Sequence, residues 1–467
     1  MASSAPQSSS TPPPAITSTP PPDVLQPAEE APSPQHSSTA PRILQIGTRA
    51  SALAIAQVNI FTSILTTLHP TLPTKTVPIS VAGDRDKTTD LHTLAQTGKS
   101  LWTEELEVLL LKGEIDCIVH SLKDVPTKVV TGCEVKIVGD RGERRDCVVF
   151  PTRRSTTTAD GSTAYIGDED GNPDASEPSH KKQKIAGSSS IPPPHPQKLS
   201  DLPPNSIVGT SSIRRSAMIR RRYPHLRIQD VRGNIGTRLR KLDDPAHGYD
   251  CIILAATGLQ RLGFGERISE WLDPGSDHDA EEGGTEEEGK ERGKGDMLHA
   301  VGQGGIGLEI REGDEWMKGL LAGREGQRGV VVNRVSWECQ AERSLLRTLE
   351  GGCSVPVGVS CSWANSSSPS STTAITGNEN NPTPEDTTND IPPSQKMSPG
   401  TLHIRASVTS VDGTRFVSAS RKQWVSNDQE ADEAGWEVAR TLVDRGAGSI
   451  LEGINLNRGM VERGDGA

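Results

Sequence analysis

The chain has 467 residues, a length that predicts two or three domains. Its hydrophobic content of 33% and aromatic content of 3% are low for a wholly globular chain, and its formal net charge of −11 argues against a general nucleic-acid-binding protein. No apolar run approaches the roughly 20 residues of a transmembrane helix. Residues 1–41 contain no Lys or Arg and lack the apolar core of a signal peptide. We therefore expect a cytoplasmic protein with no membrane partner.

Four segments have the polar, Pro-, Ser- or Gly-rich composition of disordered chain or long loops. They offer too little apolar surface to offset the entropy lost on ordering. These segments are 1–41, 151–200, 273–296 and 363–399. We expect the three internal ones to be dispensable for any chemistry.

The seven cysteines show no CxxC spacing, and their odd number argues against a disulfide framework. The sequence offers no recognisable zinc site. Cys117 and Cys251 lie in strand-like apolar runs, where we expect them in the core.

Between the polar segments, strand-like and helix-like patterns alternate in two blocks, which predicts parallel α/β sheets. In the first block we expect strands at 43–46, 77–81 and 115–120, and helices with inward faces formed by Ile55, Val58, Leu65 and Leu68 and by Leu106, Leu109 and Leu110. In the second block we expect strands at 207–208, 227–231 and 249–255, and helices that run toward Tyr223 and lie around Leu239 and Leu242.

The last block predicts a small α+β domain. Leu402, Ile404, Ala406 and Val408 alternate with other residues, and Asp412-Gly413 marks a hairpin turn. A helix follows, with an inward face formed by Ala431, Ala434, Val438 and Leu442.

A cysteine in an unusual setting belongs to this last block. An apolar-periodic segment runs up to Leu349, and Gly351-Gly352 ends the helix because glycine tolerates a left-handed conformation. Cys353 then lies on a tight loop, from which its sulfur can project away from packed surface. The alternative is a small apolar side chain tucked under a turn. The inward face of the preceding helix is formed by Val335, Cys339, Leu345, Leu346 and Leu349.

Arginines follow three of the predicted strands. Backbone N–H groups and hydroxyls at a helix N-terminus bind anions, and open α/β sheets bind ligands beyond the carboxyl ends of their strands. Arginine binds carboxylate or phosphate through a planar fork. The loops therefore predict a polyanionic ligand, whereas Arg220, Arg221 and Arg222 are expected to form a solvated basic helix face. The loop residues are Arg49 and Ser51, then Thr210, Ser211, Ser212, Arg214 and Arg215, then Arg232, Gly233 and Arg238.

Two further motifs carry charge. Residues 120–126 place Asp124 beside Lys123 after a strand, where a carboxylate can stabilise a cation or accept a proton. A structural Lys–Asp pair is the alternative. Residues 98–102 place Lys99 before a helix, which suggests a loop that closes over an anion. Residues 302–307 fit GxGxxG, but a charged linker precedes them instead of a strand, so dinucleotide binding is not expected.

Taken in order, these motifs resemble the hydroxymethylbilane synthase family, also called porphobilinogen deaminase. The matching stretches are IGTRASALA from Ile46, GKSLWTEELE from Gly98, HSLKDVP from His120, GTSSIRR from Gly209, RGNIGTRL from Arg232, AVGQGGIGLE from Ala300 and LEGGCSVPVG from Leu349. Together they span nearly all of residues 42–460 outside the polar segments.

The resemblance implies an α/β fold with two periplasmic-binding-protein-like domains facing a cleft, plus a small α+β domain that carries the cofactor cysteine. We expect domain 1 at 42–140 and 297–315, domain 2 at 141–272, an acidic linker at 273–296 and domain 3 at 316–467. It also implies a monomeric enzyme of heme biosynthesis that condenses four porphobilinogen molecules with loss of ammonia. No metal or nucleic acid is called for.

The resemblance further implies a dipyrromethane cofactor bound as a thioether to Cys353, with Asp124 as the catalytic aspartate. Cofactor-binding positions are Lys123, Arg214, Arg215, Ser121, Thr210 and Ser212. Substrate-binding positions are Arg49, Ser51, Lys99, Trp102, Ser211, Arg232, Gly233 and Arg238. Three residues depart from the family pattern: Trp102 replaces a usual Phe, Glu104 a frequent Lys and His299 a frequent Pro, so we expect altered loop electrostatics and a different interdomain hinge.

Two other functions remain open at this point. An anion-binding protein on the same scaffold would use the arginine loops but would not need Cys353 in its setting. A nucleic-acid-binding protein would use the arginines of 209–240, but no aromatic residues are interleaved with them.

Overall fold

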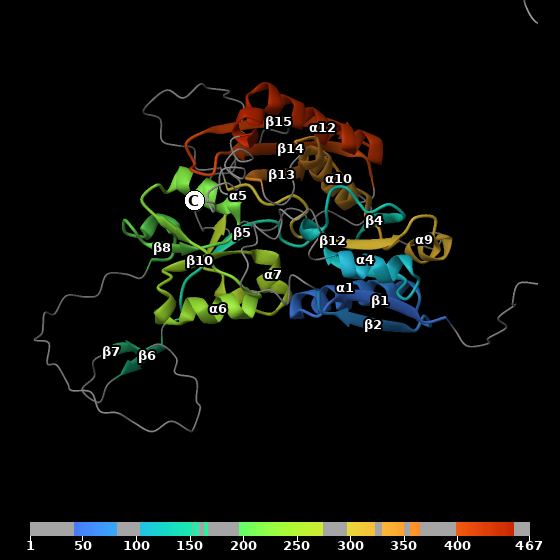
Figure 1. The fold of residues 1–467 in the computed structure, drawn as a ribbon, viewed down its shortest axis with the longest axis horizontal. Coiled ribbons are helices and arrows are strands. Elements are labelled where there is room, and N and C mark those ends of the chain that lie inside the picture. Colours follow the sequence, from blue (N-terminus) through green and yellow to red (C-terminus); the bar gives the residue numbers. More distant parts are fainter. Residues whose placement is uncertain are drawn as a thin grey trace, which may run out of the picture. The chain divides into compact units, whose positions relative to one another are not determined.

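The structure is a computed structural model. It describes residues 42–81, 103–152, 196–273, 297–322, 329–349, 355–364 and 398–452, together with the backbone of 154–157 and 163–166. All of these residues belong to the unit that begins at Arg42, and Figure 1 shows their fold as a ribbon.

The first sheet combines parallel and antiparallel strands. Its strands are, in order, β2 (Thr74–Ile79), β1 (Leu44–Arg49), β3 (Cys117–Ser121), β12 (Ile306–Arg311) and β4 (Cys133–Val138). β1 pairs in parallel with β2 and β3, as predicted, but β12 is antiparallel to β3 and β4. The parallel pairing of the three predicted strands is therefore confirmed, and the sheet is mixed because of β12, which was not predicted. β12 reaches the sheet on the chain's return from the second sheet, so it need not follow the strand direction that helical crossovers impose.

Two helices cover opposite faces of this sheet. They are α1 (Ala52–Leu68) and α4 (Glu104–Leu111). Val119 of β3 lies in one core with α1, whereas its neighbour Ile118 lies in another with α4, because successive strand residues point to opposite faces. On α1, the predicted inward residues Val58, Leu65 and Leu68 are buried and Ile55 is half-buried. On α4, Leu106 and Leu110 are buried and Leu109 is half-buried.

A third helix of this region, α9 (Glu315–Leu321), packs on the same sheet. Its residues Met317 and Leu321 share a core with Leu44 and Ile46 of β1. The domain boundary predicted at residue 315 would place this helix in the third domain. Its apolar face instead belongs with the first sheet.

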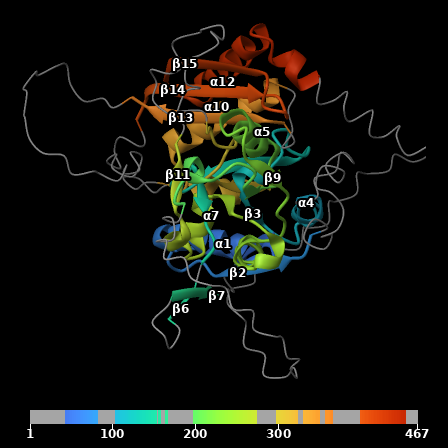
Figure 2. The ribbon, with the colours of Figure 1, turned by 90° about the vertical axis from the view of Figure 1, so that its left-hand side faces the viewer.

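The second sheet has the same mixed character. Its strands are, in order, β11 (Glu270–Leu272), β5 (Asp146–Val149), β10 (Cys251–Ala255), β8 (Ile207–Gly209) and β9 (Arg227–Gln229). β10, β8 and β9 are parallel, and β5 is antiparallel to β10 and β11. Its helices are α5 (Ile213–Arg222), α6 (Ile235–Asp243) and α7 (Ala256–Arg261). α7 lies against the start of α1 (Figure 2).

The third sheet is antiparallel and comprises β13 (Val357–Trp363), β14 (Gly400–Thr409) and β15 (Phe416–Val425). It packs with α10 (Asn333–Thr348) and α12 (Asp428–Asp444). The predicted hairpin is confirmed, with Gly413 at φ +79° in its turn. The four alternating residues of β14 are all buried. The predicted class of two α/β domains and one α+β domain is therefore confirmed.

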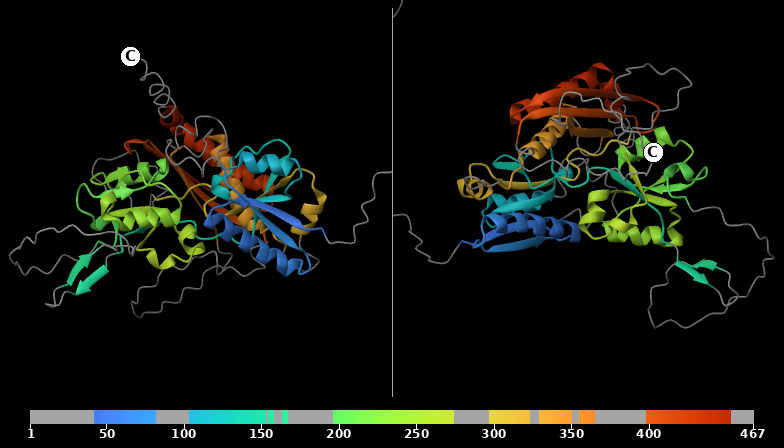
Figure 3. Two further views of the ribbon diagram at one scale, coloured as in Figure 1. Left: turned by 60° about the horizontal axis from the view of Figure 1, so that its bottom comes forward. Right: turned by 180° about the vertical axis from the view of Figure 1, so that it is seen from behind.

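The segment 151–200 was expected to be disordered or a loop, but part of it is regular. β6 (Arg154–Thr157) and β7 (Thr163–Ile166) form a two-stranded antiparallel sheet of their own (Figure 3). Single 3-10 turns occur at Leu122–Asp124 (η1), Leu199–Asp201 (η2), Pro245–His247 (η3) and Gly265–Arg267 (η4).

Two chain segments cross between the first and second sheets and pair with each other. We call them the crossings: residues 139–145, from β4 to β5, and residues 298–305, which lead into β12. The N–H of Gly142 donates to the carbonyl of Gly304 over 3.1 Å. Gly304 has a φ of +86°, and a Cβ there would overlap the carbonyl oxygen of Gly142, so no other residue fits. The GxGxxG stretch thus forms a crossing that precedes a strand, unlike a dinucleotide-binding loop, which precedes a helix.

Helix α10 holds both crossings through one carboxylate. The Arg141 guanidinium donates to both Glu342 oxygens over 2.8 Å, and the N–H of Gly302 donates to the same side chain over 2.7 Å. Both charged side chains are buried. Burial alone would raise the pKa of Glu342, but Arg141 holds it below its usual value. The helix α10, which belongs to the third domain, is therefore fixed to both crossings between the first and second sheets, which form the interdomain hinge.

His299 makes this hinge different from one that contains proline. Its N–H donates to the carbonyl of Val359 over 3.1 Å, a bond that proline cannot form, and its carbonyl accepts from the Val359 N–H over 2.9 Å. The imidazole is buried and touches the carbonyl of Ala300 through Nδ1. Burial, with Arg141 and Arg144 acting in the same direction, lowers the pKa of His299 to about 4, although Glu342 opposes this.

We predict that His299 makes stability depend on pH. A histidine whose pKa is 6.5 when unfolded and about 4 when folded stabilises the unfolded state as pH falls. The free energy of unfolding should therefore drop by about 2 kcal/mol between about pH 7.5 and pH 5 from this group. Urea titrations at both pH values should show a smaller difference for His299→Gln. The exposed His225→Gln serves as a control, and equal pH dependence in both variants would contradict the prediction.

We also predict that Gly435 is required for the contact between α12 and α10. A Cβ there would overlap the carbonyl oxygen of Ala341 and lie 3.0 Å from the backbone N of Leu345. Gly435→Ala should destabilise the fold by roughly 1–3 kcal/mol through overpacking. Gly319→Ala on α9 has no atom within 4 Å of its new Cβ and should be neutral or stabilising. Thermal unfolding of both variants would check this, and an unchanged Gly435→Ala protein would contradict it.

Candidate active site

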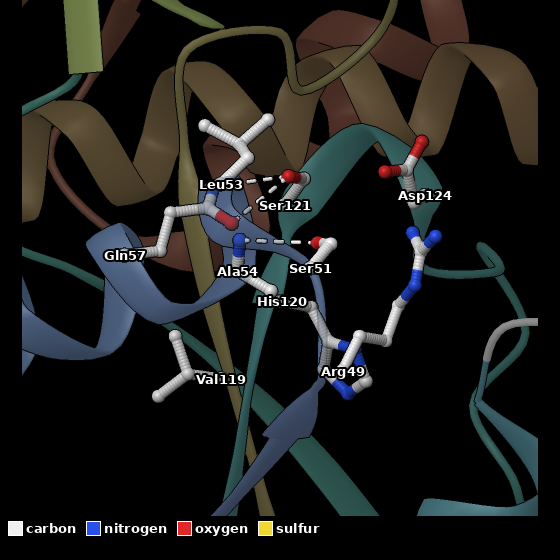
Figure 4. A pocket seen from close by; sticks show the side chains of 9 residues that line it. All are labelled: Arg49, Ser51, Leu53, Ala54, Gln57, Val119, His120, Ser121 and Asp124. Atoms are coloured by element: carbon white, nitrogen blue, oxygen red, sulfur yellow. Dashed lines mark hydrogen bonds between the residues drawn. The ribbon is translucent and has the colours of Figure 1, made fainter. Parts of the chain in front are cut away.

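A pocket lies at the end of strands β1 and β3, where the sequence placed two of its charged loops (Figure 4). Its lining residues are Arg49, Ser51, Leu53, Ala54, Gln57, Val119, His120, Ser121 and Asp124. Arg49 is the last residue of β1, and its guanidinium points toward the Asp124 carboxylate (Figure 4). The pocket therefore combines a cation and a carboxylate at the carboxyl edge of a sheet, the position where open α/β sheets bind ligands.

Asp124 is positioned by the second crossing. It ends the single turn η1, whose first residue Leu122 is buried and donates its N–H to the carbonyl of Gly305 over 3.1 Å. A Cβ at Gly305 would lie 3.0 Å from the Leu122 side chain, so the glycine leaves room for it. The turn that presents Asp124 is thus fixed to the hinge.

The predicted serines of this pocket have structural partners. The hydroxyl of Ser51 caps α1 by accepting from the N–H of Ala54 over 3.3 Å. Ser121 is paired with Gln57, whose Nε2 lies 2.9 Å from the hydroxyl. The sequence reasoning missed Gln57, although a polar residue on the inward face of a helix was a detectable signal.

The predicted hydroxyls of the second sheet shape the start of α5. Ser212 caps this helix, with 3.5 Å from its hydroxyl to the N–H of Arg215, and the buried Thr210 hydroxyl accepts from the Ser212 N–H over 3.2 Å. The Ser211 hydroxyl donates to the carbonyl of Val231 over 2.8 Å. These three residues therefore hold the loop between β8 and α5 in shape.

The sequence analysis placed Arg214 and Arg215 in a loop, and this expectation is wrong. Both lie in the first turn of α5, and each is only 5% exposed. Their guanidinium groups grip one carboxylate: Arg214 donates to Oδ2 and Arg215 to Oδ1 of Asp146, each over 2.7 Å. Each also donates to a backbone carbonyl, that of Leu298 or of Ile253. Both guanidinium groups are thus fixed before any ligand binds.

Asp146 was not singled out from the sequence, because nothing near it in the chain marks it. It begins β5 and is fully buried. Burial alone would raise the pKa of Asp146, but Arg214, Arg215 and the hydrogen bond from Gln303 hold it well below its usual value. Asp146 therefore serves as the buried counterion of both arginines.

The third arginine loop is organised around Gly233, which has a φ of +109°. Its carbonyl accepts from Nε of Arg238 over 2.8 Å. Arg238 lies in α6, not in a loop as expected, and is half-buried. Burial, together with Arg215, lowers the pKa of Arg238 to about 10. Arg232 precedes the glycine and lies 3.3 Å from a carboxylate oxygen of Asp230.

Charges from both sheets act on one another. Burial lowers the pKa of Lys123, and the cations Arg215 and Arg238 of the second sheet lower it further, while Asp124 acts in the opposite direction. Lys123 therefore lies within electrostatic reach of Arg215 and Arg238. We call this set the cation cluster: Arg49, Lys123, Arg214, Arg215, Arg232 and Arg238, with the carboxylates Asp124, Asp146 and Asp230. The cation cluster thus contains six cations and three carboxylates.

The expectation of a solvated basic face at the end of α5 is wrong. Arg220, Arg221 and Arg222 are half-buried. Arg220 donates to the carbonyl of Val411 over 2.8 Å, and the Arg221 guanidinium lies 4.1 Å from the ring centre of Phe416. Two of these arginines thus join the second domain to the third.

Three predicted site residues, Cys353, Lys99 and Trp102, lie outside the described residues. The helix before Cys353 is confirmed: α10 ends at Thr348. Four of the predicted inward residues lie in it and Leu349 caps its end, and all five are buried. Glu104, which departs from the family pattern, begins α4. A carboxylate is favourable there because it interacts with the helix dipole.

Family models match the chain over most of the described residues. Porphobilinogen deaminase, dipyromethane cofactor binding domain, matches residues 44–167 and 188–319. Porphobilinogen deaminase, C-terminal domain, matches residues 336–377. The chain belongs to the porphobilinogen deaminase family. The resemblance drawn from seven sequence motifs is thereby confirmed, and so is the dipyrromethane cofactor domain.

Curated relatives of this family cover the chain almost completely. Porphobilinogen deaminase of Neurospora crassa is 36% identical over 425 residues, which are 90% of this chain and 98% of the relative. That of Yarrowia lipolytica is 36% identical over 88% of this chain and 93% of the relative. That of Saccharomyces cerevisiae is 33% identical over 90% and 99%.

Among solved structures, the periplasmic VFT2 domain of Bordetella pertussis BvgS covers 60% of this chain and 85% of its own, with 13% identity and a TM-score of 0.27. This similarity is too low to assign a fold, which the three sheets define directly. No helix in the described part of the chain is long and apolar enough to cross a membrane.

We predict that six of the seven cysteines are inert in the native protein. Cys117 and Cys251 are in the core as expected, and all six are buried. Burial raises the pKa of each thiol, to about 11 for Cys133 and about 12 for Cys147 and Cys339. The others are Cys117, Cys251 and Cys361.

N-ethylmaleimide should therefore label these six at least about 100-fold more slowly in the native protein than in guanidinium, because thiolate is the reactive form. Peptide mapping by mass spectrometry would give the rate at each cysteine. Fast native labelling of any of the six would contradict the prediction.

Proposed function

We propose that this protein is a hydroxymethylbilane synthase, a transferase that condenses four porphobilinogen molecules head to tail and releases one ammonia for each. The product is the linear hydroxymethylbilane of tetrapyrrole and heme biosynthesis. The observation that carries the proposal is the membership in the porphobilinogen deaminase family, whose cofactor domain covers the cation cluster. The protein acts as a monomer in the cytoplasm under this proposal.

The cation cluster suits the ligands of this reaction. Each pyrrole ring carries an acetate and a propionate, so substrate, cofactor and growing chain are all polyanions. Six of the nine charged residues of the cluster are cations, which are the groups that bind carboxylates. The Nε atoms of Arg214 and Arg215 are buried and have no hydrogen-bond partner among the described residues, so they can donate to an added ligand. The donor set therefore fits a dipyrromethane group.

The cofactor supplies a pyrrole chain end with a free, nucleophilic α-carbon. We assign its attachment to the sulfur of Cys353. Its carboxylates are held by Lys123, Arg214 and Arg215, with the hydroxyls of Ser121, Thr210 and Ser212 in support. The substrate side is formed by Arg49, Ser51, Lys99, Trp102, Ser211, Arg232, Gly233 and Arg238.

Asp124 has the central chemical role. When porphobilinogen loses ammonia, the C–N bond electrons leave with nitrogen and a cationic methylenepyrrole remains. The α-carbon of the chain then forms the new C–C bond, and its proton must be removed. A carboxylate can stabilise that cation through the pyrrole N–H and take part in the proton transfer. Arg49 points toward Asp124 (Figure 4), so this carboxylate faces a cation.

The proposal predicts a covalent adduct on one residue. Intact-protein mass spectrometry of the purified protein should show the added mass of two condensed pyrrole units, and peptide mapping should place it on Cys353. Cys353→Ala should lack the adduct and all turnover. Asp124→Asn should lower kcat by roughly 10²–10³-fold, because it removes the negative charge that stabilises the cation.

Cys361→Ala is the matched control, because Cys361 is buried in the third-domain core and should not affect the adduct. A folded wild-type protein with unmodified Cys353, which gains no adduct when incubated with porphobilinogen, would contradict the proposal. That outcome would favour the anion-binding protein on the same scaffold.

A further inference from the structure

We propose that Asp146 and Gln303 are positioning residues that connect the interdomain hinge to the anion-binding arginines Arg214 and Arg215. The connection lets the position of the crossings control how firmly these arginines are held as the bound chain grows. It rests on the proposed function, since it concerns elongation of a polyanionic chain.

Gln303 belongs to the second crossing and is fully buried. Its Nε2 donates to the carbonyl of Arg144 in the first crossing over 2.6 Å and to Oδ1 of Asp146 over 2.8 Å. Its backbone carbonyl accepts from Nε of Arg141 over 2.9 Å. Gln303, a residue of the second crossing, thus contacts the first crossing and, through its side chain, the carboxylate that holds the arginines.

The two oxygens of Asp146 are not equivalent. Oδ2 accepts from Arg214, whereas Oδ1 is shared between Arg215 and Gln303. The amide of Gln303 takes part of the negative charge on Oδ1. Any hinge movement that withdraws the amide leaves that oxygen to Arg215 alone and strengthens their pairing, because unshared charge interacts more strongly in a buried site.

The growing chain competes with Asp146 for the same arginines. Each added ring brings two carboxylates, while Arg214 and Arg215 each already donate to Asp146 and to a backbone carbonyl. Three polar atoms around this carboxylate are buried without a hydrogen-bond partner among the described residues: Nε of Arg214, Nε of Arg215 and Oε1 of Gln303. These atoms give the network unused capacity to rearrange when ligand carboxylates arrive.

Two equilibria are therefore linked through one carboxylate: hinge position and arginine availability. Such linkage works in both directions, so chain carboxylates that draw Arg215 away also strengthen the Gln303–Asp146 bond.

The test uses Gln303→Leu in the full-length, cofactor-loaded protein. About two equivalents of porphobilinogen are added, the reaction is quenched, and intact-mass spectra give the ladder of complexes with one, two and three added units. With Gln303→Leu, Asp146 should hold Arg215 more firmly and later rings should compete less well. The ratio of one-unit to three-unit complexes should rise at least about threefold over wild type.

Arg261→Met is the matched control. Arg261 donates to the carbonyl of Gly304 over 2.6 Å, so this variant also weakens a crossing but leaves Asp146 untouched. Its ladder should match wild type. A Gln303→Leu ladder equal to wild type would overturn the coupling, as would an equal shift in Arg261→Met, which would indicate general loosening of the hinge.

Gln303→Asn keeps an amide but is too short to reach Asp146, and it is judged by the same ladder if Gln303→Leu fails to fold. A purely structural role would lower the melting temperature and leave the ladder unchanged. Failure of the proposed function is distinguishable, because wild type itself would then show no Cys353 adduct and no ladder.

Discussion

The site depends on the buried ion pairs that the Asp146 carboxylate forms with Arg214 and Arg215. A lone carboxylate in the interior is costly, and two arginines and an amide offset that cost here. The same contacts fix two cations in a defined geometry at the N-terminus of α5. Two adjacent buried arginines repel each other, and Asp146 is the counterion that lies between them.

The crossings and α10 extend this arrangement to the rest of the chain. Glu342 holds Arg141 and the N–H of Gly302, so both crossings are tied to a helix of the third domain. The η1 turn, which contains Asp124, is bonded to the second crossing through the hydrogen bond from the Leu122 N–H to the Gly305 carbonyl. Asp124, the arginines Arg214 and Arg215 and the helix α10 are therefore all connected to one pair of backbone segments.

Local patterns in the sequence were sufficient where the information is local. The alternating residues of β14, the hairpin at Gly413 and the inward face of α12 were predicted correctly, because each depends on periodicity and turn chemistry within a few residues. The strands β4, β5, β12 and β13 were missed. β5 and β12 follow the crossings, and their partners lie far away in the chain, so short apolar runs gave no sign of their pairing.

By itself, the sequence determined the family, the order of the motifs and the chemical types at the site, because ordered motifs and residue identity are properties of the chain. Only the tertiary structure decided which charges meet. Asp146, Gln303, Gln57 and Glu342 act through partners between 40 and 201 residues away. Burial and long-range hydrogen bonds determine which of these residues pair, and the spacing of neighbouring residues in the chain predicts neither.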